Sequence, residues 1–215
     1  MARHRTRWVE RIGKPLVFIA SLIPFGGLLW MGLQGGLGAN PVETITHQTG
    51  EWGLRFLLVT LAVTPLRRLT GWNWLQRCRR MLGLFAFFYV CLHFATYLVF
   101  DHFFNIQTIL DDVLERPYIT VGFSAFLLLI PLAVTSTNAM MKRLGRNWQR
   151  LHRLVYLIGI LAVLHFLWLV KADYLEPMIY AGLLTVLLGY RLWYHYQRAG
   201  FRWLFSGDRT LSQFD

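Results

Sequence analysis

Charged residues are scarce in this chain. Only 15% of its 215 residues are Asp, Glu, Lys or Arg, whereas 55% are hydrophobic and the mean hydropathy is +0.41. A soluble domain carries about 25% charged residues, and a chain this rich in Leu, Phe and Trp is not disordered. The length allows one domain or at most two. Because the charges cluster and leave long apolar stretches between them, the composition is typical of a polytopic membrane protein.

Cysteine and nucleotide-binding motifs are also scarce. The two cysteines, Cys78 and Cys91, form no C-x-x-C, which excludes a disulfide framework, a four-cysteine zinc site and an iron–sulfur cluster held by the chain's own thiolates. The chain has no G-x-G-x-x-G, no P-loop and no dehydrogenase domain after its last apolar segment. It therefore cannot take hydride from NAD(P)H by itself. We find no internal repeat.

Six apolar segments are present, and most approach the roughly 20 residues that cross a hydrocarbon core. Strands are disfavoured, because a membrane barrel needs segments of about ten residues with alternating polarity. The six segments span 15–33, 56–66, 81–100, 118–135, 154–170 and 178–190. We predict an all-α polytopic membrane protein with a basic amino-terminal segment (1–14), a six-helix transmembrane domain (15–193) and a basic tail (194–215).

The distribution of charge predicts the orientation of these helices. If both termini are cytoplasmic, all but three of the 22 basic residues (Arg55, Arg116 and Lys171) lie on the inside, and most of the 11 acidic residues lie outside. This pattern follows the positive-inside rule. The net charge of +11 then reflects orientation and attraction to anionic lipid. Nucleic-acid binding is disfavoured, since no module that reads nucleic acid accompanies the charge.

Two histidines are the ionisable residues that lie deep in the predicted spans. These spans contain no Asp, Glu, Lys or Arg, which disfavours a proton-coupled transporter with an acidic relay. His93 and His165 each lie roughly 18 to 20 Å from the inner end of a helix at the α-helical rise, so their depths match. Two facing imidazoles are a standard way to hold haem iron. The alternative is two unrelated core histidines, each bonded to a carbonyl or hydroxyl group.

The sequence resembles the ferric-reductase-like transmembrane domain, a superfamily that includes the membrane haem domains of NADPH oxidases. In particular it resembles the bacterial MsrQ (YedZ) family, in which a helix-3 histidine accompanies a helix-5 His-x12-His. The similar stretches cover most of the chain beyond residue 20. They are GGLGANPVETITHQTG (35–50), LVTLAVTPLRRL (58–69), RCRRMLGLFAFFYVCLHFATY (77–97), RPYITVGFSAFLLLIPLAVTSTNAMMKRLGRNWQRLHRLVYL (116–157) and HFLWLVK (165–171).

The resemblance implies a multi-pass subunit of the bacterial inner membrane that carries b-type haem and FMN. It implies electron transfer to a periplasmic molybdopterin methionine-sulfoxide reductase that repairs oxidised proteins, with catalysis in that partner. Because the chain lacks a nucleotide-binding domain, we expect the electrons to come from quinol or from a cytoplasmic flavin reductase. Two alternatives remain: a cytochrome b anchor for another periplasmic oxidoreductase, and a non-redox integral scaffold or transporter.

One position departs from the wider superfamily. Oxidase-type domains carry two histidines on helix 3 as well as two on helix 5, whereas Arg80 stands 13 residues before His93 in this chain. The outer haem thus has both of its expected ligands, His93 and His165, but His152 lacks a partner. A basic inner mouth could receive a phosphate, a haem propionate or FMN, or could be ordinary positive-inside charge. It consists of Arg77, Arg79, Arg80 and His152.

Overall fold

The computed structural model describes residues 9–206, with side chains for 11–197, and every regular element in that range is a helix. The predicted all-α class is confirmed. The elements are η1 (Val9–Gly13), α2 (Lys14–Leu33), α3 (Pro41–Thr70), α4 (Leu75–Thr96), η2 (Tyr97–Asp101), α5 (Ile106–Glu115), α6 (Pro117–Val134), α7 (Asn138–Leu144), α8 (Arg146–Leu151), α9 (Leu154–Leu169) and α10 (Leu175–Ser206). The helix α10 continues past the predicted domain boundary at 193, and parts of both predicted terminal segments (1–8 and 207–215) lie outside the described residues.

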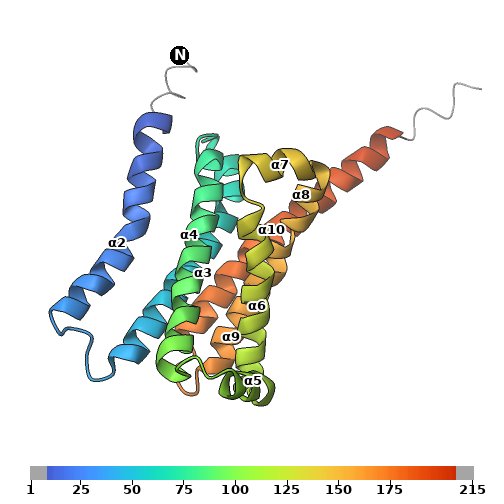
Figure 1. Cartoon of the computed structure of the whole chain (residues 1–215). Coiled ribbons are helices and arrows are strands. Elements are labelled where there is room, and N and C mark those ends of the chain that lie inside the picture. Colours follow the sequence, from blue (N-terminus) through green and yellow to red (C-terminus); the bar gives the residue numbers. More distant parts are fainter. Residues whose placement is uncertain (1–8, 207–215) are drawn as a thin grey trace, which may run out of the picture.

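Two antiparallel helix pairs form the centre of the bundle. The helix α3 packs along α4, α6 packs along α9, and α10 lies against α9 and α3 (Figure 1). The core lies where these elements meet, and Leu61, Tyr89 and Ile158 are almost fully buried there. Each pair contributes one of the two deep histidines, His93 on α4 and His165 on α9.

The helix α3 is much longer than the predicted segment 56–66. It begins at Pro41, where the Asn40 side chain accepts a hydrogen bond from the Glu43 amide, and ends before Gly71, which has a left-handed φ of 72°. Asn and Pro at the start of a helix, and a left-handed Gly just after its end, are typical helix-boundary residues. The helix therefore includes Glu51 and Arg55, which precede the predicted segment 56–66. A hydropathy pattern misses a helix whose first half is polar.

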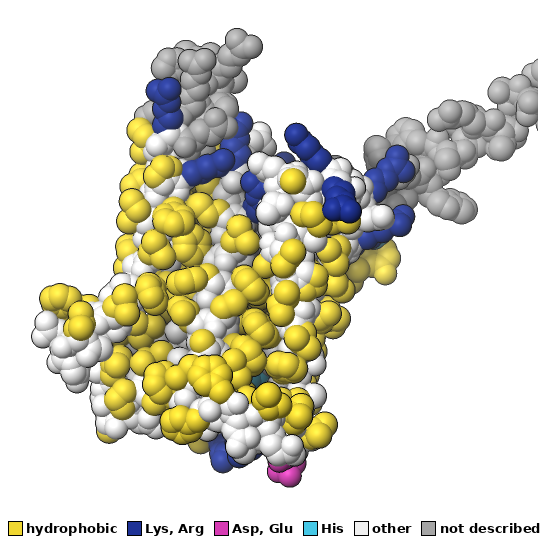
Figure 2. Space-filling view, in the orientation of Figure 1, with side chains coloured by type: hydrophobic (Ala, Val, Ile, Leu, Met, Phe, Trp, Pro, Cys, Tyr) yellow, Lys and Arg dark blue, Asp and Glu magenta, His cyan; other side chains and the backbone are white. Residues whose placement is uncertain are grey.

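Four helical stretches in the described part of the chain are long and apolar enough to cross a membrane: Arg11–Leu33, Leu75–Asp101, Pro117–Val134 and Arg146–Leu169. The helices α3 and α10 are longer than any of these but are not among them. Hydrophobic side chains cover the middle of the visible face, and Lys and Arg gather at the end where α7 and α8 lie (Figure 2).

A buried hydroxyl group attaches α2 to the bundle. Pro24 interrupts the hydrogen-bond ladder of α2, and the Tyr89 hydroxyl of α4 enters at this point. It donates to the Ser21 carbonyl at 2.8 Å and accepts from the Phe25 amide at 3.1 Å. A neighbouring helix thus satisfies backbone groups next to a proline, as bilayer-spanning helices require.

Candidate functional site

A cavity of about 620 Å³ lies between the two helix pairs, with His93 and His165 in its wall. This volume is in the range of small-molecule and cofactor sites, about 300 to 1,000 Å³. The centroids of the two imidazole rings are 6.2 Å apart, and the ring planes are inclined by 75°. Most of the remaining wall is apolar, with residues such as Leu54, Val90 and Phe126. The structure therefore brings together the two histidines whose depths match in the sequence.

Each of the two histidines is oriented by a backbone carbonyl on the partner helix of its pair. The His93 Nδ1 lies 2.9 Å from the Thr46 carbonyl oxygen of α3, and the His165 Nδ1 lies 2.7 Å from the Tyr118 carbonyl oxygen of α6. A carbonyl oxygen can only accept, so in the tautomer that satisfies these contacts Nδ1 carries the proton. This leaves the Nε2 lone pair of both rings available to a metal.

A glycine lets each imidazole approach the neighbouring helix. A Cβ atom at Gly50 would lie 3.0 Å from the His93 Nδ1, and a Cβ atom at Gly122 would lie 2.7 Å from the His165 Nδ1. Distances below 3.0 Å are essentially never seen for real Cβ atoms. Each glycine is four residues after the carbonyl that binds the ring, so both lie on the same face of their helix. A side chain is therefore excluded at Gly122 unless the ring moves, and at Gly50 it would require a shift of a few tenths of an ångström.

The two halves of the site repeat at a constant spacing. Thr46, Gly50 and His93 have their counterparts 72 residues further along the chain at Tyr118, Gly122 and His165, and each histidine is 47 residues after its carbonyl. The tripeptide LHF occurs at 92–94 and again at 164–166. The finding corrects the expectation that the chain has no internal repeat. The repeat is hard to see in the sequence because only a few contact positions recur, while most residues between them differ.

The separation of the rings fits a shared metal ion. An ion bound to two imidazole nitrogens at about 2 Å each places the ring centroids roughly 6 Å apart, in agreement with the 6.2 Å observed. Two imidazoles alone do not complete the coordination of a transition metal, whereas a porphyrin supplies the equatorial nitrogens and leaves two axial positions. The pair His93 and His165 can therefore hold a haem iron in an otherwise apolar cavity.

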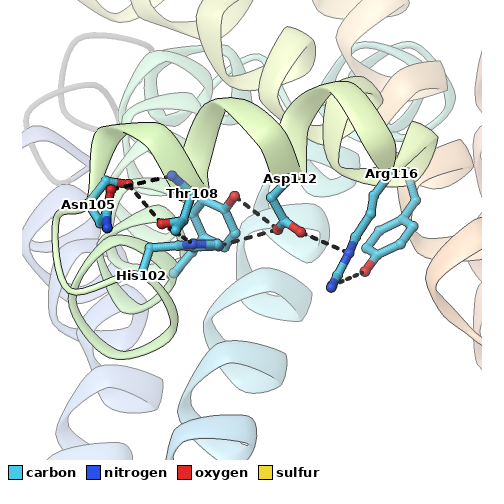
Figure 3. A network of polar contacts seen from close by, with 7 residues as sticks. His102, Asn105, Thr108, Asp112 and Arg116 are labelled. Carbon is cyan, nitrogen blue, oxygen red and sulfur yellow. Dashed lines mark hydrogen bonds and ion pairs between the residues drawn. The ribbon is translucent and has the colours of Figure 1, made fainter.

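A polar network that joins η2, α5 and α6 lines one end of the cavity. Asp112 lies between His102 and Arg116 (Figure 3), with its carboxylate 3.2 Å from the His102 Nε2 and 2.8 Å from the Arg116 Nε. The Tyr97 hydroxyl donates to the same carboxylate at 3.1 Å, and Arg116 donates to the Tyr118 hydroxyl. The Tyr118 hydroxyl and the Asp112 carboxylate hold the pKa of Arg116 above its ordinary value. The side chain of His102, which directly follows η2, is only 13% exposed.

A partly buried ion pair flanks the cavity on the α3 side. Glu51, which lines the cavity, lies 2.7 Å from the Arg55 guanidinium one turn later. Arg55 also donates to the Tyr180 hydroxyl of α10 at 2.8 Å and lies over the Trp52 ring at 4.9 Å. Removing one partner would leave the other charge partly buried and without its ion-pair partner. We interpret the pair as a brace between α3 and α10 beside the histidine cavity.

The residues of the predicted inner mouth are only partly brought together. Arg79 lies close enough to His152 to interact with it electrostatically, whereas Arg80 binds the Asn138 side chain and the Met141 sulfur of α7, and Arg77 is exposed. Positions 77 and 80 lie on one face of α4, and position 79 lies on a different face. The four residues therefore do not converge on one point.

His152 itself has an unusual environment. Its ring stacks on Trp148 with the centroids 3.9 Å apart, and its Nδ1 lies 3.1 Å from the Trp148 carbonyl oxygen. Its Nε2 is buried and has no hydrogen-bond partner in the part of the chain that the structure describes. A buried nitrogen in this state can bind a metal or accept a hydrogen bond. Its role as a ligand stays a prediction.

Comparison with known proteins decides the family. The family model described as ferric reductase like transmembrane component matches residues 49–163. Three relatives bear the name protein-methionine-sulfoxide reductase heme-binding subunit MsrQ. They come from Herminiimonas arsenicoxydans (58% identical, 86% of this chain and 86% of the relative), Xanthomonas euvesicatoria pv. vesicatoria (58%, 84% and 85%) and Rhodospirillum rubrum (54%, 85% and 88%). This chain belongs to the MsrQ family. No solved structure matches it.

Membership in the MsrQ family confirms the resemblance inferred from the sequence, and the structure adds residues that sequence reasoning missed. Four residues orient the two histidines, and none of them does so through its own side chain: Thr46, Gly50, Tyr118 and Gly122. Two of them act through backbone carbonyls and two through the lack of a side chain. The 72-residue spacing of Gly50 and Gly122, equal to that of the histidines, is the signal that could have revealed them.

Proposed function

We propose that this chain is the haem-carrying, electron-transfer subunit of a methionine-sulfoxide reductase system. The observation that carries the proposal is the facing pair His93 and His165, with each Nδ1 on a backbone carbonyl and the ring centroids 6.2 Å apart. The relatives' names describe a heme-binding subunit. When bound, b-type haem supplies one-electron transfer. His93 and His165 would both serve as protein ligands of the haem iron, which would suit electron transfer rather than catalysis on a bound substrate.

We infer that six helices cross the bacterial inner membrane and that both termini are cytoplasmic. Three observations support this. There are six long helices in the described chain, Lys and Arg gather at one end (Figure 2), and the acidic residues Asp111, Asp112 and Glu115 of α5 lie at the other end. The histidine cavity is then nearer the periplasm, and His152 is nearer the cytoplasm.

Reporter fusions test this orientation. Fusions near Pro41, Asp112 and Asp173 are expected to be periplasmic, and fusions near Trp74 and Gly145 cytoplasmic, because basic segments stay on the inside. Paired alkaline phosphatase and fluorescent-protein activities measure the two sides. A periplasmic carboxy terminus would contradict the six-span arrangement.

The electrons, in this proposal, come from quinol or a cytoplasmic flavin reductase and leave to a periplasmic molybdopterin methionine-sulfoxide reductase. His152, with its unpartnered Nε2, and the nearby Arg79 would hold a second carrier, FMN or a second haem, on the inner side. Arg77 and Arg80 would add positive charge there for a phosphate or a propionate. A second carrier is useful because an outer haem leaves much of the roughly 30 Å hydrocarbon core still to be crossed.

A spectroscopic assay in proteoliposomes tests the proposed function. The purified protein is expected to show a Soret band and to be reduced by a quinol analogue, or by a flavin reductase with free flavin and NADPH. NADPH alone is expected to have no effect, because the chain has no nucleotide-binding domain. Adding the partner reductase and methionine sulfoxide should then reoxidise the haem. A folded protein that shows no Soret band after purification from cells supplied with a haem precursor would contradict electron transfer. Reoxidation only by another partner would favour the anchor alternative.

Variants of the inner side separate electron input from haem binding. His152→Ala, and Arg79→Gln combined with Arg80→Gln, are expected to slow reduction by the donor and to weaken any bound FMN. They should leave the outer haem in place. His152 lies just before α9, 13 residues or roughly 20 Å of helical rise from His165, and such distant sites act independently. Dithionite should reduce the haem normally. Loss of all haem with full retention of flavin would instead assign His152 to the principal haem.

A further inference from the structure

A groove of about 890 Å³ lies between α9 and α10, on the side of α9 that faces away from the histidine cavity. Ile160, Leu164 and Leu167 line the groove, whereas Ile158 and His165 line the cavity. The groove extends from Arg153 to Leu167 on α9 and from Ala181 to His195 on α10. Each of these stretches is roughly 21 Å long at the helical rise.

One end of the groove is basic and the rest is largely apolar. Arg153, Arg191 and His195 lie at this end, beside Tyr156, and no Asp or Glu is among the lining residues. Arg191 is fixed in position: its guanidinium donates to the carbonyls of Leu187 and Leu61 and lies over the Tyr156 ring. Within the described residues no carboxylate forms an ion pair with it. The end of the groove therefore presents positive charge that the described chain does not neutralise.

We propose that this groove binds one anionic phospholipid, with its phosphate among Arg153, Arg191 and His195 and an acyl chain along the apolar part. The guanidinium group matches phosphate in geometry and charge. One leaflet contributes about 15 Å of hydrocarbon, so a groove of roughly 21 Å accommodates an acyl chain and its headgroup. Basic pockets between transmembrane helices on the cytoplasmic side bind anionic headgroups. A quinol shares the apolar tail, but its uncharged ring would leave the positive charge unneutralised.

Two glycines of α10 provide a matched pair for the test. Gly189 lines the groove, and a Cβ atom there would meet nothing within 4 Å. Gly182 is equally open around its Cβ position but is not among the lining residues. Gly189→Leu should therefore fill the groove without a backbone clash, and Gly182→Leu makes the same change in helix propensity and hydrophobicity outside it.

Native mass spectrometry of the full chain in detergent measures binding of phosphatidylglycerol. We expect Gly189→Leu to abolish the bound lipid and Gly182→Leu to retain it. Arg153→Gln should weaken binding roughly three- to tenfold, as for loss of one partly exposed charged contact, whereas Arg150→Gln on α8 should not. Phosphatidylcholine should bind more weakly. Millimolar inorganic phosphate should not displace the lipid, because most of the binding comes from the acyl chain.

Three results would overturn the proposal. The first is equal phosphatidylglycerol binding by the wild-type chain and Gly189→Leu. The second is displacement of the lipid by inorganic phosphate alone, which would make the site one for a free anion. The third is binding of decylubiquinone that Gly189→Leu blocks while phosphatidylglycerol binding is unchanged, which would make the groove a quinone site. If Gly189→Leu does not fold, the comparison of Arg153→Gln with Arg150→Gln tests the proposal instead. Equal phosphatidylglycerol binding by these two variants would then overturn it.

Discussion

Replacing either His93 or His165 with alanine is expected to remove most of the bound haem. The two rings approach each other across the cavity at 6.2 Å, and each has only its Nε2 free once Nδ1 binds a carbonyl. An alanine leaves one axial position without a protein ligand and also opens a void in the wall. The wild-type protein should show a low-spin spectrum with two nitrogenous axial ligands. Haem content per protein and the reduced absorption spectrum measure the loss.

His47→Ala provides the matched control for this prediction. His47 lines the same cavity, but its side chain is exposed, whereas His93 and His165 are not. This variant should keep the low-spin haem. That result would show that haem loss in His93→Ala and His165→Ala is specific to these two histidines and does not follow from removing just any histidine near the cavity. If both His93→Ala and His165→Ala retained the wild-type reduced spectrum, the ligand assignment would be wrong. Imidazole added to either variant should partly restore the low-spin signal, since it supplies the missing nitrogen.

The matching depth of His93 and His165 could be predicted from the sequence because helical rise is uniform along apolar segments. The six long helices could be predicted for the same reason, with accurate bounds for α2, α6 and α9. The length of α3 could not, since its capping residues and tertiary packing determine where it begins. Glu51 and Arg55 consequently lie outside the predicted segment 56–66, although their ion pair lies inside α3 and next to the cavity.

The inner side shows a second limit of sequence reasoning. Three arginines are neighbours in the sequence: Arg77, Arg79 and Arg80. Because successive helical residues point in different directions, closeness in the sequence does not bring their side chains to one site. The contact of Arg80 with α7 depends on two short helices, α7 and α8, whose existence the hydropathy pattern does not reveal. The amphipathic helix α5, which supplies Asp112 to the outer network, is missed for the same reason: it is too short and too polar to resemble a span.

Gly122→Ala is expected to disturb the haem site even though glycine contributes no ligand. The added Cβ would lie 2.7 Å from the Nδ1 and 2.9 Å from the Cε1 of His165, so the ring must move away from the Tyr118 carbonyl. Overpacking of this kind costs about 1 to 3 kcal/mol. We expect a fall in haem content and conversion of part of the haem from low-spin to high-spin, measured by electron paramagnetic resonance. A merely structural role would lower the melting temperature without changing the spin state of the haem that remains.

Gly50→Ala should have the same kind of effect but a smaller one, because its Cβ would lie 3.0 Å from the His93 Nδ1 and 3.1 Å from its Cε1. Gly182→Ala is the control, since its Cβ would meet nothing within 4 Å. This order of effects, Gly122 before Gly50 before Gly182, follows from steric distance alone. Helix propensity predicts the opposite sign, because alanine stabilises a helix by up to about 1 kcal/mol relative to glycine. An unchanged spin state with a higher melting temperature in Gly122→Ala would show that the glycine does not position His165.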